Sequence, residues 1–263
     1  MSTATLNPPL KSRLDQSQID TFHEQGFLRI GKILTDEEIL FYQKEYDAEF
    51  ARAWETDSLR NLSIDNGSDV ETKKSASKQM LQIMQMCERN IHFRKLIYDA
   101  RILDLMADLM GPNIQLFHDQ ALFKPAQVGG PVSWHQDNAY WKCRPANLIS
   151  CWLTFDDVVR ENGAMQLIPG SHLKPVWHEQ NASTNALLDL KGVDESKAVV
   201  VDLPAGGCLF HHCQTLHYTQ PNTTDHQRRA LAIHFMPPGT TSEHRTGIIP
   251  VDFSHPLLRC RTN

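Results

Sequence analysis

The sequence predicts a mainly β fold with α-helices, in which an N-terminal helical part packs against one side of an antiparallel sandwich or barrel. Apolar residues recur at helical spacing in the first third of the chain, whereas six or more short β-rich runs, separated by Gly, Pro, Asn and Asp, follow Asn113. With 263 residues, 41% of them hydrophobic, the chain can bury a sizeable core. We expect one domain over 1–263. Its parts are a mostly helical segment over 1–112, a β core over 113–238 and a C-terminal tail over 239–263.

The first third is expected to hold two helices joined by a short extended segment. The first helix has Ser17 as its candidate N-cap and ends at Gly26, because glycine favours the left-handed conformation that closes a helix. Residues 27–30 form the extended segment. The second helix begins at Thr35, which is followed by three acidic residues that suit the first turn of a helix.

The segment 56–77 is polar and aperiodic, which predicts a long loop or a mobile lid over the site. Residues 78–111 then predict two or three helices that end at Gly111. Three methionines fall near the start of this stretch. Methionine fills irregular gaps in cores, so we expect these side chains to pack in the core rather than in a substrate pocket. They are Met80, Met84 and Met86.

Composition argues against several classes of protein. A net charge of −5 and the absence of a long Lys/Arg run argue against nucleic-acid binding. The polar N-terminus lacks the apolar core of a signal peptide, and no 18-residue apolar run occurs, so we expect a cytoplasmic protein that does not contact membranes. Nothing indicates an obligate protein partner. The six cysteines form no CxxC pair, which favours buried reduced thiols over a zinc ribbon or a disulfide scaffold.

The motif "SWHQDNAYW" places His135 and Asp137 two positions apart in a strand-like segment. Side chains at i and i+2 of a strand point to the same face, so these two residues can converge on one metal ion. One histidine and one carboxylate are two of the three ligands in the facial triad of non-haem iron(II) enzymes. A second histidine must therefore come from elsewhere in the chain.

Candidates for that histidine lie in "FHHCQTLHYTQPNTTDHQRRALAIHF", which predicts a hairpin with its turn near 221–224. With a two-residue loop, His217 and Arg228 would be cross-strand neighbours, and a guanidinium beside a metal ligand suits a carboxylate. His211 and His212 fit satisfied or surface histidines better than metal ligands. The adjacent Arg229 is expected to be solvated.

At this point the sequence resembles a known family. "WHQDNAYW", "ENGAMQLIPGSH", "FHHCQTLHYTQPN" and the following Arg228 are similar to motifs of the phytanoyl-CoA dioxygenase family of iron(II)- and 2-oxoglutarate-dependent oxygenases. The N-terminal "IDTFHEQGFLRIGKILTDEEI" is also similar, so the resemblance covers about 18–237. It implies a double-stranded β-helix, the cupin-like jelly roll, flanked by the N-terminal helices.

The resemblance also implies roles for individual residues. His135, Asp137 and His217 would be the iron ligands, and Arg228 would hold the distal carboxylate of 2-oxoglutarate. Related halogenases carry a small residue at the position of Asp137, so this carboxylate favours oxygenation.

Four weaker correspondences concern the co-substrate 2-oxoglutarate. Thr219 matches a small hydroxyl near the distal carboxylate, Trp152 matches a tryptophan that packs against the co-substrate, and Gln120 falls on a strand position that touches it. Taken alone, Trp152 would fit a core position better, because large aromatics dominate interiors. Gln82 stands near the position where some members send a lysine toward the co-substrate.

The implied activity is oxidation of a C–H bond in a small organic substrate, using Fe(II), 2-oxoglutarate and O2 and releasing succinate and CO2. The substrate could be an acyl-CoA or a secondary metabolite, although the scattered lysines and arginines form no convincing site for acyl-CoA phosphates. Asn138, Tyr140 and Trp141 are our candidates for the pocket wall.

Three other interpretations stay open. A metal-binding jelly roll could act as a sensor or structural protein without turnover. A cupin-type hydrolase or isomerase would use the metal as a Lewis acid and would not need Arg228. A metal-free β-sandwich that binds a partner would make the HxD motif incidental.

Overall fold

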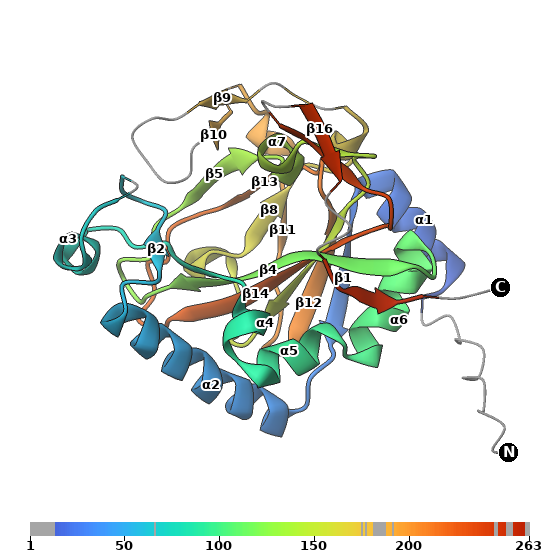
Figure 1. Cartoon of the computed structure of the whole chain (residues 1–263). Coiled ribbons are helices and arrows are strands. Elements are labelled where there is room, and N and C mark those ends of the chain that lie inside the picture. The colour runs from blue at the N-terminus through green and yellow to red at the C-terminus, as the bar shows by residue number, and fades with distance from the viewer. Residues whose placement is uncertain are drawn as a thin grey trace, which may run out of the picture.

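The computed structural model describes residues 14–65, 67–174, 176, 178–180, 188–190, 192–244, 247–250 and 255–260. Two antiparallel sheets face each other (Figure 1). The eight-stranded sheet runs β1 (Phe27–Lys32), β12 (Gly207–His212), β7 (Ile149–Thr154), β14 (Arg228–Met236), β4 (Ile114–Lys124), β3 (Leu81–Met84) and β2 (Arg60–Asn61), with β17 (Leu257–Arg259) beside β4. The four-stranded sheet runs β11 (Val199–Val201), β8 (Met165–Leu167), β13 (His217–Thr219) and β5 (Val132–His135). This double-sheet arrangement confirms the predicted jelly-roll class.

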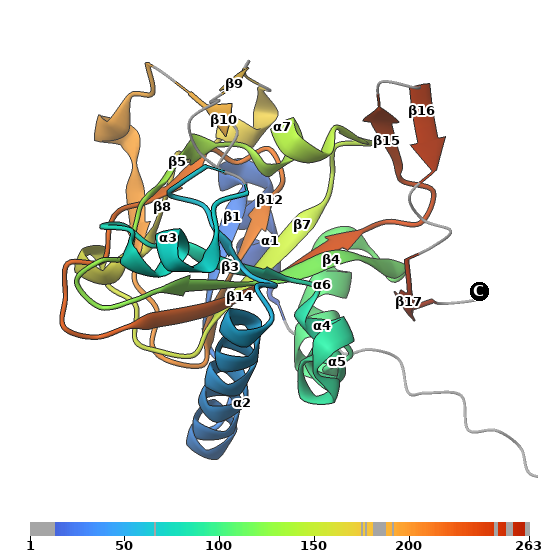
Figure 2. The ribbon, with the colours of Figure 1, turned by 60° about the vertical axis from the view of Figure 1, so that its left-hand side comes forward.

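Helices cover the face of the larger sheet that points away from the smaller sheet. Figure 2 shows α2, α4 and α5 below the larger sheet, with β5 and β8 of the smaller sheet above it. The helices are α1 (Gln16–Gln25), α2 (Asp36–Glu55), α3 (Val70–Ser75), α4 (Met86–Arg89), α5 (Ile91–Ile97), α6 (Ala100–Met110) and α7 (Asp137–Trp141), with 3-10 turns at Arg160–Asn162, Ser171–Leu173 and Glu195–Lys197. Peripheral strands are β6 (Cys143–Arg144), β9 (Glu179–Gln180), β10 (Leu188–Asp189), β15 (Thr241–His244) and β16 (Gly247–Pro250). Three strands, β15, β16 and β17, lie in the segment expected to be a tail.

The apolar core is divided by the larger sheet. On β14, Leu231, Ile233 and Phe235 point outward and pack with the helices, because alternate side chains of a strand face opposite sides. Ala230 and Ala232 point inward, toward the smaller sheet. The small side chain of Ala232 lines a cavity that lies between the two sheets.

Both predicted N-terminal helices are confirmed, with one change of cap. Helix α1 begins after Asp15, whose side chain accepts a hydrogen bond from the backbone of Gln18, so Ser17 is not the N-cap. Gly26 ends the helix at φ 83°. Thr35 caps α2 as expected and forms a reciprocal capping box with Glu38.

The prediction of helix from residue 78 onward is wrong at its start, because β3 precedes α4, α5 and α6. Gln, Met and Leu are good helix formers, but pairing with β4 overrides that preference. The alternation along β3 turns Leu81 and Ile83 toward the helical core and Gln82 toward the cavity. Met86 packs in the core as expected, whereas two of the predicted core methionines, Met80 and Met84, line the cavity.

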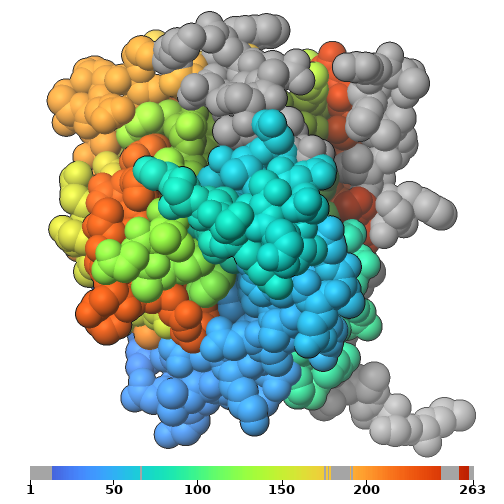
Figure 3. Space-filling view, turned by 90° about the vertical axis from the view of Figure 1, so that its left-hand side faces the viewer, coloured from blue at the N-terminus to red at the C-terminus, as the bar shows by residue number. Residues whose placement is uncertain are grey.

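The segment 56–77 is not a structureless loop, since it contains β2 and α3. Figure 3 shows this segment, in cyan and teal, on the outer surface next to the blue of α2. Its inner side contributes Arg60 and Leu62 to the cavity wall. A lid role for this segment stays a prediction.

All six cysteines are free thiols, and five of them are buried as expected, whereas Cys260 is exposed. Within the described residues, no helix combines the length and the apolar character needed to cross a bilayer.

Candidate metal centre and cavity

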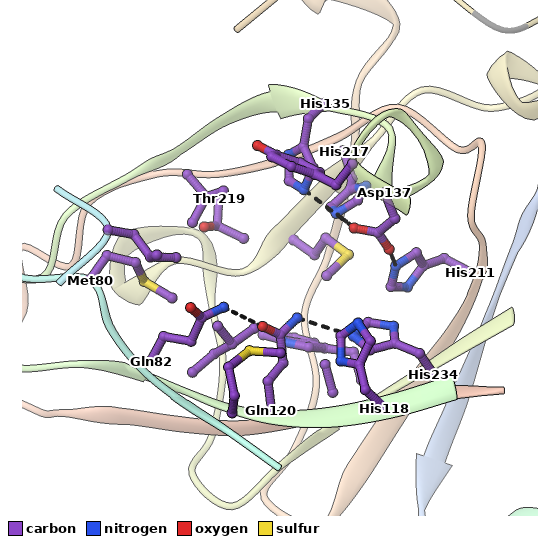
Figure 4. Close-up of a pocket in the computed structure, with 18 of the residues that line it drawn as sticks. Met80, Gln82, His118, Gln120, His135, Asp137, His211, His217, Thr219 and His234 are labelled. Carbon is purple, nitrogen blue, oxygen red and sulfur yellow. Dashed lines mark hydrogen bonds and ion pairs between the residues drawn. The ribbon is translucent and has the colours of Figure 1, made fainter. Parts of the chain in front are cut away.

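A cavity of about 240 Å³ lies between the two sheets and is lined from both. Figure 4 shows His135, Asp137 and His217 on one side of it, with Gln82, Gln120, His118 and His234 opposite. The other lining residues are Arg60, Leu62, Met80, Met84, Leu122, Val132, Tyr140, Trp141, Trp152, Met165, His211, Thr219, Arg228 and Ala232.

Two histidines and one aspartate converge at this cavity. His135 ends β5 and pairs directly with His217 of β13, so their rings lie 4.1 Å apart between centroids. Contrary to our prediction, the HxD motif is not one continuous strand, because Asp137 is the first residue of α7. Its Oδ1 nevertheless lies 3.4 Å from His135 Nε2 and 3.6 Å from His217 Nε2. One ligand atom from each residue falls within 4.8 Å of the others, so the three could hold a metal ion.

Backbone hydrogen bonds fix the orientation of both histidine rings. His135 Nδ1 lies 2.7 Å from the carbonyl of Ser133, and His217 Nδ1 lies 3.0 Å from the carbonyl of Thr215. A carbonyl can only accept, so each Nδ1 carries the proton and each Nε2 presents its lone pair toward Asp137. Outer hydrogen bonds of this kind orient histidines that bind metals.

Electrostatics keep His217 and Asp137 in the protonation states that bind metal. Burial lowers the pKa of His217 to about 3, aided by the neighbouring His135, so the ring is neutral at neutral pH. Burial alone would raise the pKa of Asp137. The interactions of the carboxylate with His217, His135 and His211 outweigh burial, and the pKa of Asp137 stays well below its usual value. A neutral imidazole and an ionised carboxylate are the forms that coordinate metals.

A row of polar side chains on the larger sheet contacts the carboxylate of Asp137, and this row was not predicted from the sequence. The register of the larger sheet aligns His118, His234, Ser150 and His211 in one row across β4, β14, β7 and β12. His211 Nε2 lies 3.2 Å from Asp137 Oδ2, and Ser150 Oγ lies 3.4 Å from the same oxygen. His211 Nε2 thus has a partner, the candidate metal ligand Asp137, whereas the buried Nδ1 of the same ring has none among the described residues. Both contacts fall on Oδ2 and leave Oδ1 facing the two histidines.

A chain of hydrogen bonds leads from Gln82, near the edge of the larger sheet, to Asp137. Each group in the chain donates to the next one toward Asp137. Gln82 donates to Gln120, and the Gln120 amide donates to His234 Nε2 at 3.1 Å. His234 Nδ1 then donates to Ser150 Oγ at 2.6 Å, and Ser150 donates to Asp137. Burial, with a smaller contribution from the nearby His118, holds the pKa of His234 well below its usual value, which suits this single-proton tautomer.

At the other end of the cavity, Arg228 and Thr219 carry polar atoms that are left without partners. The Arg228 side chain is almost completely buried, and its Nη1 donates to the carbonyl of Leu122 at 3.0 Å. Within the described residues, Arg228 Nε and Thr219 Oγ1 are buried and have no hydrogen-bond partner. Trp152 lies against the guanidinium, 5.4 Å from ring centroid to Cζ. Burial lowers the pKa of Arg228 to about 10, so the group remains charged at neutral pH.

The predicted hairpin pairing of His217 with Arg228 is wrong. His217 begins β13 of the smaller sheet and Arg228 begins β14 of the larger sheet, so the chain crosses between the sheets over 220–227. Both side chains still line the same cavity, because the two sheets face each other. Arg228 instead pairs with Lys124, whose Nζ donates to the carbonyls of Thr219 and Gln220 and so ties the two sheets together.

Two further expectations are corrected. Arg229 is not solvated, because strand alternation turns it outward under α2, where it pairs with Asp47 at 2.8 Å and with Asp156 at 2.6 Å. Asn138 does not line the cavity; its side chain hydrogen bonds to the backbone of Cys143. Tyr140 and Trp141 do line it, as predicted.

Comparisons with known proteins agree with this architecture. The sequence profile of the phytanoyl-CoA dioxygenase family matches residues 22–230. A probable alpha-ketoglutarate-dependent hypophosphite dioxygenase of Stutzerimonas stutzeri is 31% identical over 52% of this chain and 50% of that protein. The human peroxisomal phytanoyl-CoA dioxygenase is 27% identical over 81% of this chain and 66% of that protein. The chain thus spans about half to two thirds of the length of these relatives.

Solved structures share the fold. The non-haem alpha-ketoglutarate-dependent epimerase SnoN from nogalamycin biosynthesis superposes with a TM-score of 0.71 at 21% identity, covering 93% of this chain and 98% of that one. The non-haem monooxygenase ThoJ superposes with a TM-score of 0.72 at 23% identity, covering 93% of this chain and 84% of that one. Because the family profile covers most of its length, the chain belongs to the phytanoyl-CoA dioxygenase family.

Proposed function

We propose that this chain is an Fe(II)- and 2-oxoglutarate-dependent dioxygenase that oxidises a C–H bond of a small organic substrate. One observation carries the proposal. Two histidines and one carboxylate face the same cavity as the buried Nε of a guanidinium and a buried hydroxyl, and these last two atoms have no hydrogen-bond partner among the described residues. The first group suits a metal ion, and the second suits a carboxylate that the chain itself does not supply.

The donor set fits iron(II). Two neutral imidazoles and one carboxylate are the ligands of the facial triad, which leaves positions on the metal open to other molecules. The three proposed ligands are His135, Asp137 and His217. A Lewis-acid hydrolase of the cupin type could use the same set, but it would have no need for an unpaired buried arginine.

The second group fits 2-oxoglutarate. A carboxylate beside Arg228 and Thr219 would accept from Nε and from the hydroxyl, the two buried atoms without partners. Trp152 would pack against the same end of the co-substrate. Gln120 and Gln82, which also line the cavity, are proposed contacts nearer the metal.

Iron(II) and 2-oxoglutarate, once bound, would supply oxygen activation with release of succinate and CO2. The chain's own part is to bind, orient and exclude water. Burial of Arg228 and Asp137 strengthens their electrostatic interactions with ligands, because little water reaches them between the sheets to screen their charges. The hydrogen bonds on Asp137 Oδ2 hold its carboxylate in one orientation.

The substrate is proposed to be a small molecule rather than an acyl-CoA. The relatives named above act on hypophosphite and phytanoyl-CoA according to their names, so proteins similar to this chain differ widely in the size of their substrates. Here the cavity measures about 240 Å³, which is below the range typical of sites for drug-sized ligands. Among the described residues no lysine lines it, and coenzyme A phosphates would need several cations.

The proposal is tested by anaerobic titration with iron(II) and 2-oxoglutarate. Chelation of iron by the keto acid should produce a weak visible charge-transfer band in wild type and none in His217→Ala. Succinate release that requires iron, 2-oxoglutarate and O2 would then identify an oxygenase. A band without any succinate release across a broad substrate panel would favour a sensor. No band from folded, iron-loaded protein would overturn the proposal.

A further inference from the structure

A second arginine faces the cavity and has no assigned role. Arg60 lies on β2, at the edge of the larger sheet, and lines the cavity together with Leu62. Its strand position pairs with Gln82, which in turn pairs with Leu122, so all three side chains point to the inner face. Within the described residues, the Arg60 guanidinium forms no hydrogen bond or ion pair.

Arg60 and Arg228 belong to different parts of the wall. Strands β3 and β4 lie between β2 and β14 in the sheet. Neighbouring strands are about 4.8 Å apart, so the two arginines start from strands separated by roughly 14 Å. A co-substrate carboxylate held by Arg228 and Thr219 therefore leaves Arg60 available for another molecule.

The other charged side chains around the cavity do not neutralise the positive charge of Arg60. Of the permanently charged side chains that line it, Asp137 is the only anion and Arg228 the only other cation among the described residues. With the proposed ligands bound, iron(II) and Arg228 together balance Asp137 and the dianion 2-oxoglutarate. One positive charge, that of Arg60, remains. A half-buried cation is stabilised by an anionic partner, and the chain does not provide one here.

We propose that Arg60 binds an anionic group of the substrate, an oxyacid carrying one negative charge such as a carboxylate, phosphonate or phosphinate. This rests on the proposed function, and it assigns the substrate class that the function leaves open. The guanidinium would hold the oxyacid by paired hydrogen bonds at the edge of the sheet. The bond to be oxidised would then point toward His135 and Asp137.

The test uses protein loaded anaerobically with iron(II) and 2-oxoglutarate, with the charge-transfer band as the readout. Acetate, methylphosphonate and hypophosphite are titrated as probes, and acetamide serves as the neutral counterpart of acetate. At least one anion is expected to shift the band in wild type, with affinity about 10- to 100-fold weaker in Arg60→Gln. Arg60→Lys should retain part of the binding. The control Arg160→Gln removes an equal charge from an exposed position outside the cavity and should match wild type.

Each outcome separates this inference from the proposed function. A band that forms equally in wild type and Arg60→Gln, with anion binding lost only in the variant, supports both. Anions that bind Arg60→Gln as well as wild type, or no better than acetamide, would overturn the role of Arg60 alone. The same holds if Arg60→Gln weakens 2-oxoglutarate itself, because Arg60 would then serve the co-substrate. No band in wild type would overturn the proposed function and this inference with it.

Discussion

Arg228 and Arg229 are adjacent in the chain but lie on opposite faces of β14, and their surroundings differ sharply. Arg229 faces the helices and is paired with Asp47 and Asp156. Arg228 faces the cavity, is more deeply buried, and has no carboxylate partner among the described residues. On the side of β14 that faces the helices, here called the structural face, the arginine charge is paired with carboxylates. On the side that faces the cavity, the cavity face, the arginine charge has no such partner and can bind a ligand. Unpaired buried charge is costly, so we interpret Arg228 as a group kept for a ligand.

The largest effect is expected from removing a proposed metal ligand. Asp137→Ala should abolish iron(II) binding at this site and all turnover, because two ligands do not complete the triad. Metal titration of the apo-protein and succinate release measure both. His226→Ala, at an exposed histidine on the connection before β14, is the control and should behave as wild type. Unchanged iron affinity in Asp137→Ala would contradict the assignment.

The cavity face is tested next with Arg228→Met. Loss of the buried positive charge, and of the hydrogen bond that its Nε would donate, should weaken 2-oxoglutarate binding by about 100-fold, without changing iron affinity. The free energy of unfolding without ligand should stay near that of wild type, since the charge has no carboxylate partner to lose. Calorimetry under nitrogen and urea unfolding give the two quantities. A large loss of stability would identify Arg228 as structural instead.

The structural face should respond in the opposite way. Arg229→Met removes the ion-pair partner of the largely buried Asp156 and should lower the free energy of unfolding by about 2–3 kcal/mol, somewhat less than loss of a fully buried pair because Asp47 is half exposed. Its 2-oxoglutarate affinity should equal that of wild type. Urea unfolding beside the same calorimetric titration checks the contrast. Weakened co-substrate binding in a folded variant would break it.

Asp119 is an exception on the structural face, because one of its carboxylate oxygens has no partner among the described residues. Burial raises the pKa of Asp119 to about 6 from an ordinary value of 3.8. The folded protein thus favours the protonated form, and this contribution to stability is lost as pH rises from about 4 through 6. Asp119→Asn should therefore gain about 2–3 kcal/mol relative to wild type between pH 4 and 7. Urea unfolding of both proteins across this pH range measures the effect. If the pKa of Asp119 is not raised, the free energies of unfolding of Asp119→Asn and wild type will differ by the same amount at every pH.

The smallest effect is expected from His211→Phe. Asp137 Oδ2 would lose one of its two hydrogen-bond donors, and outer contacts of this kind change metal affinity by about 10-fold or more. The triad itself stays intact, so turnover at saturating iron should largely remain. Iron titration of the variant measures the shift, with the neighbouring His212→Phe as the control. Equal iron affinity in both variants would mean that Ser150 alone suffices.

The sequence predicts the parts of this site that belong to short motifs better than the parts that residues far apart in the chain form together. The HxD spacing, the distal histidine and Arg228 are visible in the sequence because motif resemblance carries them. The row formed by His118, His234, Ser150 and His211 is not visible, because it exists only through the register of four strands that are far apart in the chain. The position of Arg60 in the cavity wall is not visible either, because it also depends on strand pairing.

Local preference also misled the prediction in identifiable places. The segment that begins with Met80 is rich in helix formers, yet strand pairing with β4 determines its structure. The pairing of His217 with Arg228 assumed a tight hairpin, whereas the chain crosses from one sheet to the other. Short-range rules thus found the two N-terminal helices, the cap at Thr35 and the β-rich character of the chain after Asn113. They could not supply the partners of the strands.

The most direct test of the central claim compares wild type, Arg228→Met and Arg229→Met by the anaerobic charge-transfer band during 2-oxoglutarate titration. We predict that iron-loaded wild type and Arg229→Met saturate at the same concentration, while Arg228→Met requires about 100-fold more. If all three proteins saturate together, the cavity-facing arginine does not hold the co-substrate, and the distinction drawn here between the two faces of β14 is wrong.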